Sequence, residues 1–157
     1  MEPDERTFNE LIHRQRDIIW RVCCTYRLSA AWTTEDAFHE VLCALWQGYG
    51  GFDRRSSERT WVYRVATNTM LSLVRKTGNQ PTAPPPPQRE PSYRDDDYRD
   101  LVEMIAALPE PDHTIVMAHL EGFSYAETAK ATGLSVGAVS MRLTRALRKL
   151  RKQYKQS

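Results

Sequence analysis

The stretch from Ser124 to Lys152 constrains the fold of this chain most, because it has the pattern of two helices joined by a tight turn. Ser124 can cap the first helix, and Glu127, three residues later, can close a capping box. Gly133 is expected to end that helix, because glycine accepts a positive φ at a helix C-terminus without steric cost. Ser135 is the predicted N-cap of the second helix. This order of signals predicts a helix-turn-helix.

The second of these helices combines an apolar stripe with a strongly basic remainder. The stripe has spacings of three and four, is expected to face a core, and consists of Val136, Val139, Leu143, Leu147, Leu150 and Tyr154. Between Val136 and Ser157 there are seven Lys or Arg residues and no Asp or Glu. This pattern is typical of a recognition helix whose first turns meet base edges while its later cations contact phosphates. A solvated basic helix is the alternative, but the capped partner helix and the glycine turn favour DNA binding.

Length, charge and cysteine content restrict the class of protein. The 157 residues suffice for one ordinary domain or two small ones, and the net charge of +2 hides a basic excess at the C-terminal end. The three cysteines form an odd set in a chain without an apolar N-terminal signal stretch, which favours a reduced, cytoplasmic setting. No apolar run is long enough to span a bilayer, so we expect a soluble protein without direct membrane insertion.

The sequence gives no sign of a metal, a cofactor or a catalytic site. His39 and Cys43 have the i, i+4 spacing of a ligand pair, but no second pair at a recognisable spacing completes a metal site. Buried cysteine is the ordinary alternative. There is no glycine-rich phosphate loop with Lys, no paired His ligands on one helix, and no distinct Ser, His and Asp set. We therefore predict no cofactor, no metal and no enzyme activity.

The first part of the chain, residues 1–76, predicts a small helical domain. Apolar spacing predicts helices from Glu5 to Leu28, from a cap at Thr33 or Thr34 to about Gln47, and from Trp61 to Lys76. The expected apolar face of the second helix is Phe38, Val41, Leu42, Leu45 and Trp46. The side chains of the third helix that are expected to face the core are those of Trp61, Val65, Thr69 or Met70, and Leu73 or Val74. A polar loop from Phe52 to Thr60 precedes it.

Residues 77–98 are predicted to be a flexible linker, because six of the 22 are proline and no apolar periodicity is present. Residues 99–157 then predict a second domain of four helices, in which a helix at Leu101–Leu108 and another at His113–Leu120 precede the helix-turn-helix. His113 and His119 are expected at the surface or at caps. The predicted fold is therefore all-α, with two small helical domains joined by a Pro-rich flexible linker.

These residues resemble the extracytoplasmic-function sigma factors, the minimal members of the sigma-70 superfamily of bacterial RNA polymerase. EDAFHEVLCALW at Glu35–Trp46 and FDRRSSERTWVYRVATNTMLSLVRK at Phe52–Lys76 are similar to region two of that family. The segment from Ala107, beginning ALPEPDHTIVMAHLEGFSYAETAKATGLS, is similar to region four. The resemblance covers nearly the whole chain. It implies a factor that binds core RNA polymerase, directs it to specific promoters and helps to open the minus-ten DNA.

The resemblance also implies three sets of site residues. The set that docks on core polymerase is Asp36, His39, Glu40, Leu42 and Trp46. The minus-ten set, which captures a flipped base and lines the path of the unpaired strand, is Phe52, Asp53, Arg54, Arg55, Ser56, Ser57, Arg64 and Asn68. The minus-thirty-five set is Ser140, Met141, Arg142, Thr144, Arg145, Arg148 and Lys149.

Several positions depart from the family pattern. His39 stands where Gln is common, and Glu58 stands where many members have an apolar residue, so the sequence does not predict how the base-capturing loop packs. Ala138, Ser140 and Met141 offer few groups for reading bases, so we expect much of minus-thirty-five recognition to come from DNA shape and phosphate contact.

The resemblance implies three partners: bacterial core RNA polymerase, promoter DNA, and an anti-sigma factor or other regulator. The alternative interpretation is a stand-alone helix-turn-helix transcriptional regulator with an N-terminal interaction domain. The two differ in one observable, because a regulator of that kind binds duplex DNA without polymerase.

Overall fold

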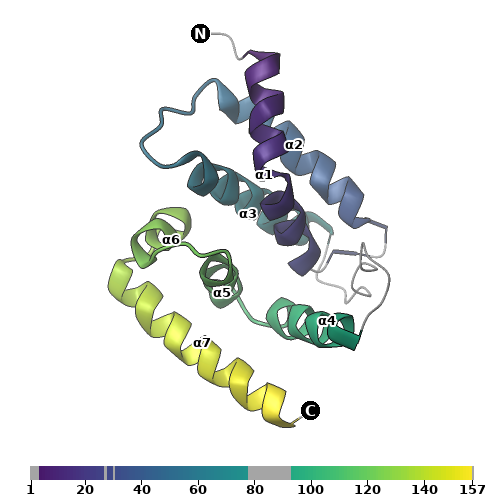
Figure 1. The fold of residues 1–157 in the computed structure, drawn as a ribbon, viewed down its shortest axis with the longest axis vertical. Helices are drawn as coiled ribbons and strands as arrows, with labels where there is room; N and C mark the ends of the chain where they lie inside the picture. The colour runs from purple at the N-terminus through teal and green to yellow at the C-terminus, as the bar shows by residue number, and fades with distance from the viewer. Residues whose placement is uncertain (1–3, 27, 30, 78–92, 157) are drawn as a thin grey trace. The chain divides into compact units, whose positions relative to one another are not determined.

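The computed structural model describes residues 4–26, 28–29, 31–77 and 93–156, and over these residues it contains seven α-helices and no strand (Figure 1). The predicted all-α fold is confirmed. The chain divides into two compact units, Met1–Pro85 and Pro86–Ser157. The proline-rich part of the predicted linker, residues 78–92, lies outside the described residues, whereas residues 93–98 belong to a helix.

The first unit is a three-helix bundle in which every helix packs on the other two. It contains α1 (Glu5–Thr25), α2 (Thr34–Tyr49) and α3 (Glu58–Thr77). Helix α1 starts where predicted, with the Asp4 carboxylate accepting a hydrogen bond from the Arg6 backbone at 3.1 Å, but it ends three residues before Leu28. Thr33 caps α2, as predicted.

The inward face of α3 differs from the predicted one. Met70 and Leu73 are buried, as predicted, but the other buried residues are Val62, Tyr63 and Ala66, together with Thr60 and Thr67. Trp61 and Val65 are only half-buried, so the prediction that they form the core face was wrong. The Trp61 ring instead lies 4.8 Å from the Phe52 ring at the start of the helix.

Aromatic rings close one end of this bundle. The Phe8 ring of α1 lies 5.0 Å from the Trp46 ring and 5.3 Å from the Tyr49 ring of α2, both edge to face. Tyr49 in turn lies 6.3 Å from Trp61. Such pairs contribute about 0.5 to 1.5 kcal/mol beyond their buried area. They hold the end of α2 and the loop that follows it against α1 and α3.

The second unit is organised around α5. It contains α4 (Tyr93–Ala106), α5 (Asp112–Leu120), α6 (Tyr125–Thr132) and α7 (Val136–Gln156), and α5 packs on each of the other three. Residues His113 to Ala118 of α5 are buried in succession. The prediction that His113 lies at the surface was wrong, because a short helix surrounded by other helices has no solvated side there. His119 is exposed, as expected.

Only the middle of the predicted α7 stripe lies in the core. Val139, Leu143 and Leu150 are buried, Leu147 between them is half-buried, and Ala146, which the apolar pattern did not include, is buried as well. Val136 and Tyr154 are 49% and 56% exposed, so the prediction was wrong at both ends of the stripe. The flanking turns of α7 therefore present their apolar residues to solvent. Among the described residues, no helix has the length and apolar character needed to cross a membrane.

Candidate nucleic-acid and protein-binding sites

The exposed face of α2 carries most of the predicted polymerase-docking set. Asp36, His39 and Glu40 are exposed, Trp46 is 40% exposed, and Leu42 is half-buried between this face and the core. The Trp46 ring is held in place by its edge-to-face contact with the Phe8 ring of α1. The face thus combines negative charge with an anchored aromatic ring, an arrangement suited to binding another protein.

Asp36 also has a structural role that the sequence analysis did not assign. Its carboxylate accepts a hydrogen bond from the Thr33 backbone N–H at 3.0 Å, and its own N–H donates to the Thr33 hydroxyl at 3.0 Å. The hydrogen bond from the Thr33 backbone lowers the pKa of Asp36 below its usual value. The pattern Thr-x-x-Asp is a capping-box signal, so this role was readable from the sequence.

The loop after α2 holds a strained backbone turn. Arg54 has a φ of 61°, in the left-handed region that side chains other than glycine rarely adopt. The Asp53 carboxylate stabilises the turn by accepting from the Arg55 backbone N–H at 3.1 Å and by pairing with the Arg55 guanidinium at 3.0 Å. At the end of the loop the Ser57 hydroxyl accepts from the Thr60 N–H at 3.1 Å and caps α3. Asp53 and Ser57 therefore shape the loop.

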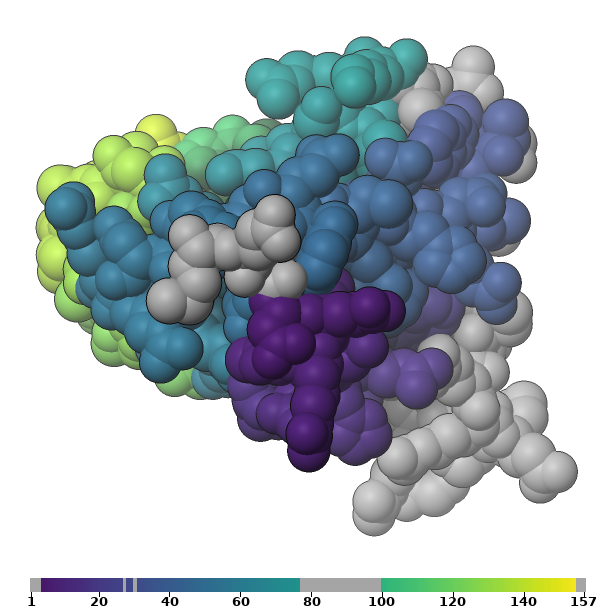
Figure 2. All heavy atoms as spheres, turned by 90° about the horizontal axis from the view of Figure 1, so that it is seen from above, coloured from purple at the N-terminus to yellow at the C-terminus, as the bar shows by residue number. Residues whose placement is uncertain are grey.

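A hollow of about 290 Å³ lies beside this loop. Its lining comes from α1, from the end of α2 and from the loop, and consists of Thr7, Leu11, Arg14, Tyr49, Phe52, Arg54, Ser56 and Glu58. Figure 2 shows this side of the first unit, with the start of α1 in dark purple against the blue segment that closes α2 and enters the loop. The volume is near the lower end of the range in which proteins bind small ligands, about 300 to 1,000 Å³.

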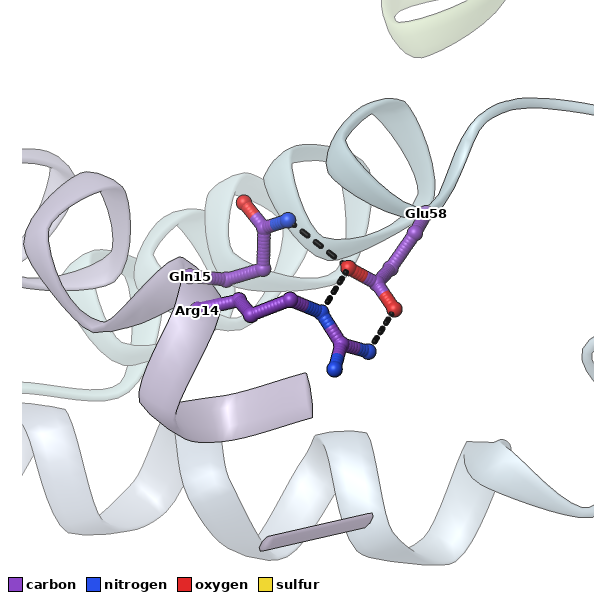
Figure 3. A network of polar contacts seen from close by, with 3 residues as sticks. All are labelled: Arg14, Gln15 and Glu58. Atoms are coloured by element: carbon purple, nitrogen blue, oxygen red, sulfur yellow. Dashed lines mark hydrogen bonds and ion pairs between the residues drawn. The ribbon is translucent and has the colours of Figure 1, made fainter. Parts of the chain in front are cut away.

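A polar cluster joins α1 to the first turn of α3 at the hollow (Figure 3). The Arg14 guanidinium donates through Nε to Glu58 Oε2 at 3.2 Å and through Nη2 to Oε1 at 2.5 Å, and Gln15 Nε2 donates to Oε2 at 2.8 Å. The bond from Arg14 lowers the pKa of Glu58, and the same bond raises the pKa of Arg14. The polar residue at position 58 thus has two partners on α1. We refer to Arg14, Gln15 and Glu58 as the α1–α3 clasp.

The remaining residues of the minus-ten set lie on the outer side of α3. Arg64 and Asn68 are both exposed and are four residues apart, so they share one face of the helix. That face is distinct from the buried side formed by Tyr63, Ala66 and Met70. A cation and an amide in this position can bind phosphate and base edges of a strand that runs along α3.

Two of the three cysteines, Cys23 and Cys24, are shielded from solvent in the first unit. Burial raises the pKa of the Cys23 thiol to about 12 and that of Cys24 to about 11, so both remain protonated thiols. Cys43 is exposed on α2, in contrast to the expected burial. Over the part of the chain that the structure describes, no three His, Cys, Asp or Glu side chains lie close enough together to hold a metal.

The second unit contains the predicted helix-turn-helix, formed by α6 and α7. Ser124 and Glu127 close a capping box at the start of α6, with distances of 3.1 and 3.0 Å. Gly133 ends that helix with a φ of 77° and donates its N–H to the Ala129 carbonyl at 2.8 Å. The Ser135 hydroxyl accepts from the Ala138 N–H at 3.1 Å at the start of α7. All three predicted signals are confirmed.

The minus-thirty-five set lies on the solvated side of α7. Met141 is 57% exposed, and Arg145, Arg148 and Lys149 are also exposed, whereas Ser140 is half-buried. The Thr144 hydroxyl donates to the Ser140 carbonyl at 2.9 Å, an intrahelical bond that occupies its proton.

Arg142 differs from its neighbours because it has an acidic partner. Its guanidinium lies 3.4 Å from the Asp112 carboxylate, at the start of α5. The ion pair ties α7 to α5 and restricts the orientation of Arg142. No sequence signal joins two residues 30 positions apart, so this contact was not predicted.

Comparison with known proteins gives the same division of the chain. A family model described as sigma-70 region 2 matches residues 11–80, and one described as sigma-70 region 4 matches residues 98–150. The first match contains the α2 face and every residue that lines the hollow except Thr7, and the second contains the helix-turn-helix.

Two curated relatives resemble the chain over most of its length. The ECF RNA polymerase sigma factor RpoE of Cereibacter sphaeroides is 30% identical over 136 residues, covering 78% of this chain and 73% of the relative. The ECF RNA polymerase sigma factor SigM of Mycobacterium tuberculosis is 28% identical over 156 residues, covering 94% and 76%.

Two solved structures share the fold. The sigma factor RpoE in complex with the anti-sigma factor NepR, from Bartonella quintana, has a TM-score of 0.79 at 19% identity and covers 97% of this chain and 98% of that chain. CnrH in complex with the cytosolic domain of CnrY has a TM-score of 0.74 at 21% identity, covering 98% and 91%. With both sigma-70 regions matched in order and this identity to RpoE, the chain belongs to the extracytoplasmic-function family of RNA polymerase sigma factors, which are transcription initiation factors and not enzymes.

Proposed function

We propose that this sigma factor binds bacterial core RNA polymerase, directs it to a restricted set of promoters and helps to open the minus-ten DNA. The observation that carries the proposal is the hollow beside the loop from Phe52 to Ser57. It combines aromatic walls from Tyr49 and Phe52 with hydroxyl and guanidinium groups, which are the groups that bind an unstacked base.

The hollow suggests how opening proceeds without ATP. A base cannot be read on its full edge while it is stacked, and extruding one costs a few kcal/mol. Insertion into the hollow and contacts of the unpaired strand with Arg64 and Asn68 offset that cost. The strained turn at Arg54 presets the loop, so less ordering is required when the base arrives.

The second unit is proposed to bind the minus-thirty-five duplex through α7. Arg145, Arg148 and Lys149 supply exposed cations for phosphates, and phosphate contacts give affinity that falls with salt. Met141 and Thr144 provide a methyl-rich surface for base edges. This composition favours positioning on the duplex over detailed base readout.

The α2 face is proposed to dock on core polymerase. Its exposed Glu40 and the anchored Trp46 fit a basic partner surface with an apolar centre. Because two relatives of the same fold are described in complexes with an anti-sigma factor and with the cytosolic domain of another protein, we further propose a protein regulator that covers the binding faces of this chain.

Co-purification with core polymerase, followed by transcription from a library of promoter fragments, tests the proposal. We expect retention of core and enrichment of a shared pair of minus-ten and minus-thirty-five sequences. Binding to duplex DNA by the chain alone, with no retention of core, would instead identify a stand-alone helix-turn-helix regulator.

A further inference from the structure

We propose that Arg14 of α1 reads the extruded base in the hollow, and that Glu58 positions its guanidinium for a base with two adjacent acceptors, as guanine has at O6 and N7. The inference rests on the proposed function and adds α1 to the promoter-reading site. Neither Arg14 nor Glu58 is among the residues that the family resemblance implied for DNA binding.

The clasp leaves one edge of the guanidinium available. Glu58 accepts from Nε and Nη2, which form the side edge of Arg14. Figure 3 shows the third nitrogen pointing away from the Glu58 carboxylate. A guanidinium has five N–H donors in a fixed plane, so the end edge formed by Nη1 and the second hydrogen of Nη2 can still donate two parallel hydrogen bonds.

Guanine matches this edge. Bidentate donation by arginine to guanine O6 and N7 is the commonest specific contact between proteins and bases. Glu58 holds the guanidinium through its adjacent edge, and Gln15 in turn holds the Glu58 carboxylate, which reduces the rotational freedom that would be lost on binding the base. An adenine at the same place would present its N6 amino group, a donor, to one of the guanidinium N–H donors, so that hydrogen bond could not form.

Stability alone does not explain the clasp. The side chain of Arg14 is 52% exposed and that of Glu58 is 30% exposed, and ion pairs at such exposure contribute little to folding. Arg14, Arg54 and Glu58 all line the same hollow, which therefore carries two guanidinium groups against one carboxylate. That excess of donors favours an acceptor-rich ligand.

Arg14→Lys tests the inference in the complete holoenzyme. Lysine keeps the charge and its attraction to Glu58 but lacks the planar pair of donors. The probe is a fork-junction DNA whose unpaired non-template segment is randomised, selected with the wild-type holoenzyme and with the variant. Arg16→Lys, the same change at an exposed position of α1, is the matched control. Glu58→Gln weakens the support of Arg14 while it leaves Arg14 in place.

We expect the wild-type holoenzyme to prefer guanine at one unpaired position. Arg14→Lys should lower that preference about tenfold and leave the other positions unchanged. Glu58→Gln should lower the same preference by less, and Arg16→Lys should leave it unchanged. Replacement of that guanine by 7-deazaguanine, which lacks the N7 acceptor, should weaken wild-type binding more than Arg14→Lys binding.

The alternatives give different results. An unchanged base preference in Arg14→Lys would overturn the inference and leave the clasp as a structural contact. A uniform loss across positions, with the salt slope lowered by about one, would overturn base reading in favour of a phosphate contact. Failure of the wild-type chain to retain core or the unpaired strand would refute the proposed function before any variant is compared.

Discussion

Thr33 and Asp36 are linked by two reciprocal hydrogen bonds, each 3.0 Å long, that close the first turn of α2. The face proposed to dock on polymerase and the cap of its helix therefore share a residue. Loss of a cap costs about 0.5 to 2 kcal/mol. Reversal of the Asp36 charge would combine that loss with any loss of binding, so it is a poor probe of docking.

Glu40→Lys is the sharper test of the docking face. Glu40 is exposed on the same helix, away from the cap, so we expect the free energy of unfolding to change by less than about 0.5 kcal/mol. If the face binds core polymerase, co-purification with core should fall at least about tenfold, because a charge is reversed within the interface. Asp36→Asn retains an oxygen that can accept from Thr33 and should keep the fold, so its retention of core measures the contribution of the Asp36 charge alone. Full retention of core by Glu40→Lys would place docking on another face.

Because Arg54 lies in a strained turn, two substitutions can test the role of its side chain separately from that of its backbone conformation. Arg54→Gly should stabilise the protein by up to about 1 kcal/mol, because glycine adopts a φ of 61° without steric strain. Arg54→Ala removes the same guanidinium but keeps the strain. If the guanidinium contacts the unpaired strand, both variants should bind fork-junction DNA more weakly than the wild type, although only the glycine variant gains stability. Chemical unfolding and DNA titration measure the two effects separately.

The features that were predicted correctly depend on local patterns. Ser124 with Glu127, Gly133 and Ser135 each act within a few residues, so their spacing alone determines the caps and the turn. The capping roles of Asp36 and Ser57 have the same local character. Their signals were present in the sequence, but the family resemblance had already given these residues a binding role.

The features that were missed depend on packing between distant segments. The burial of His113 follows from the three helices that pack on α5, and the buried face of α3 is set by its packing against α1 and α2. The Arg14–Glu58 pair joins residues 44 positions apart. Periodicity identifies an apolar face, but it does not show which polar side chains meet across helices.

We expect Asp112 to limit how much Arg142 contributes to DNA binding. The ion pair at 3.4 Å holds Arg142 and places a carboxylate beside the basic face of α7. We expect Asp112→Asn to increase affinity for the minus-thirty-five duplex modestly and to steepen its salt dependence, because a negative charge is removed and Arg142 is released. A decrease in affinity would show that the pair orients Arg142 productively.

Arg145 provides the comparison for Arg142, because it is exposed on the same helix. Arg145→Ala should weaken binding by about 1 to 3 kcal/mol if its guanidinium contacts a base edge, or lower the salt slope by about one if it contacts phosphate. The measurement is binding of holoenzyme to a minus-thirty-five duplex at several salt concentrations. An unchanged affinity and an unchanged slope together would move the recognition face elsewhere on α7.

His113 should make the second unit sensitive to acid. Burial lowers its pKa from 6.5 to about 4, and this effect outweighs the Glu110 carboxylate, whose Oε1 lies 3.4 Å from Nδ1. Between these two values the unfolded chain binds the proton and the folded chain does not. The free energy of unfolding should therefore fall as the pH decreases from 6.5 to 4, by about 3 kcal/mol in total, and this contribution should be constant above pH 6.5.

The pH dependence of His113→Gln isolates this effect from the titration of carboxylates, which both proteins share. Far-UV circular dichroism follows the unfolding of both units, whereas the four tryptophans, at positions 20, 32, 46 and 61, report on the first unit alone. The variant should lose the extra slope between pH 6.5 and 4 in circular dichroism and leave the fluorescence transition unchanged. An imidazole NMR titration gives the pKa directly. A midpoint near 6.5, or an equal slope in the variant, would mean that the buried imidazole is not the group responsible.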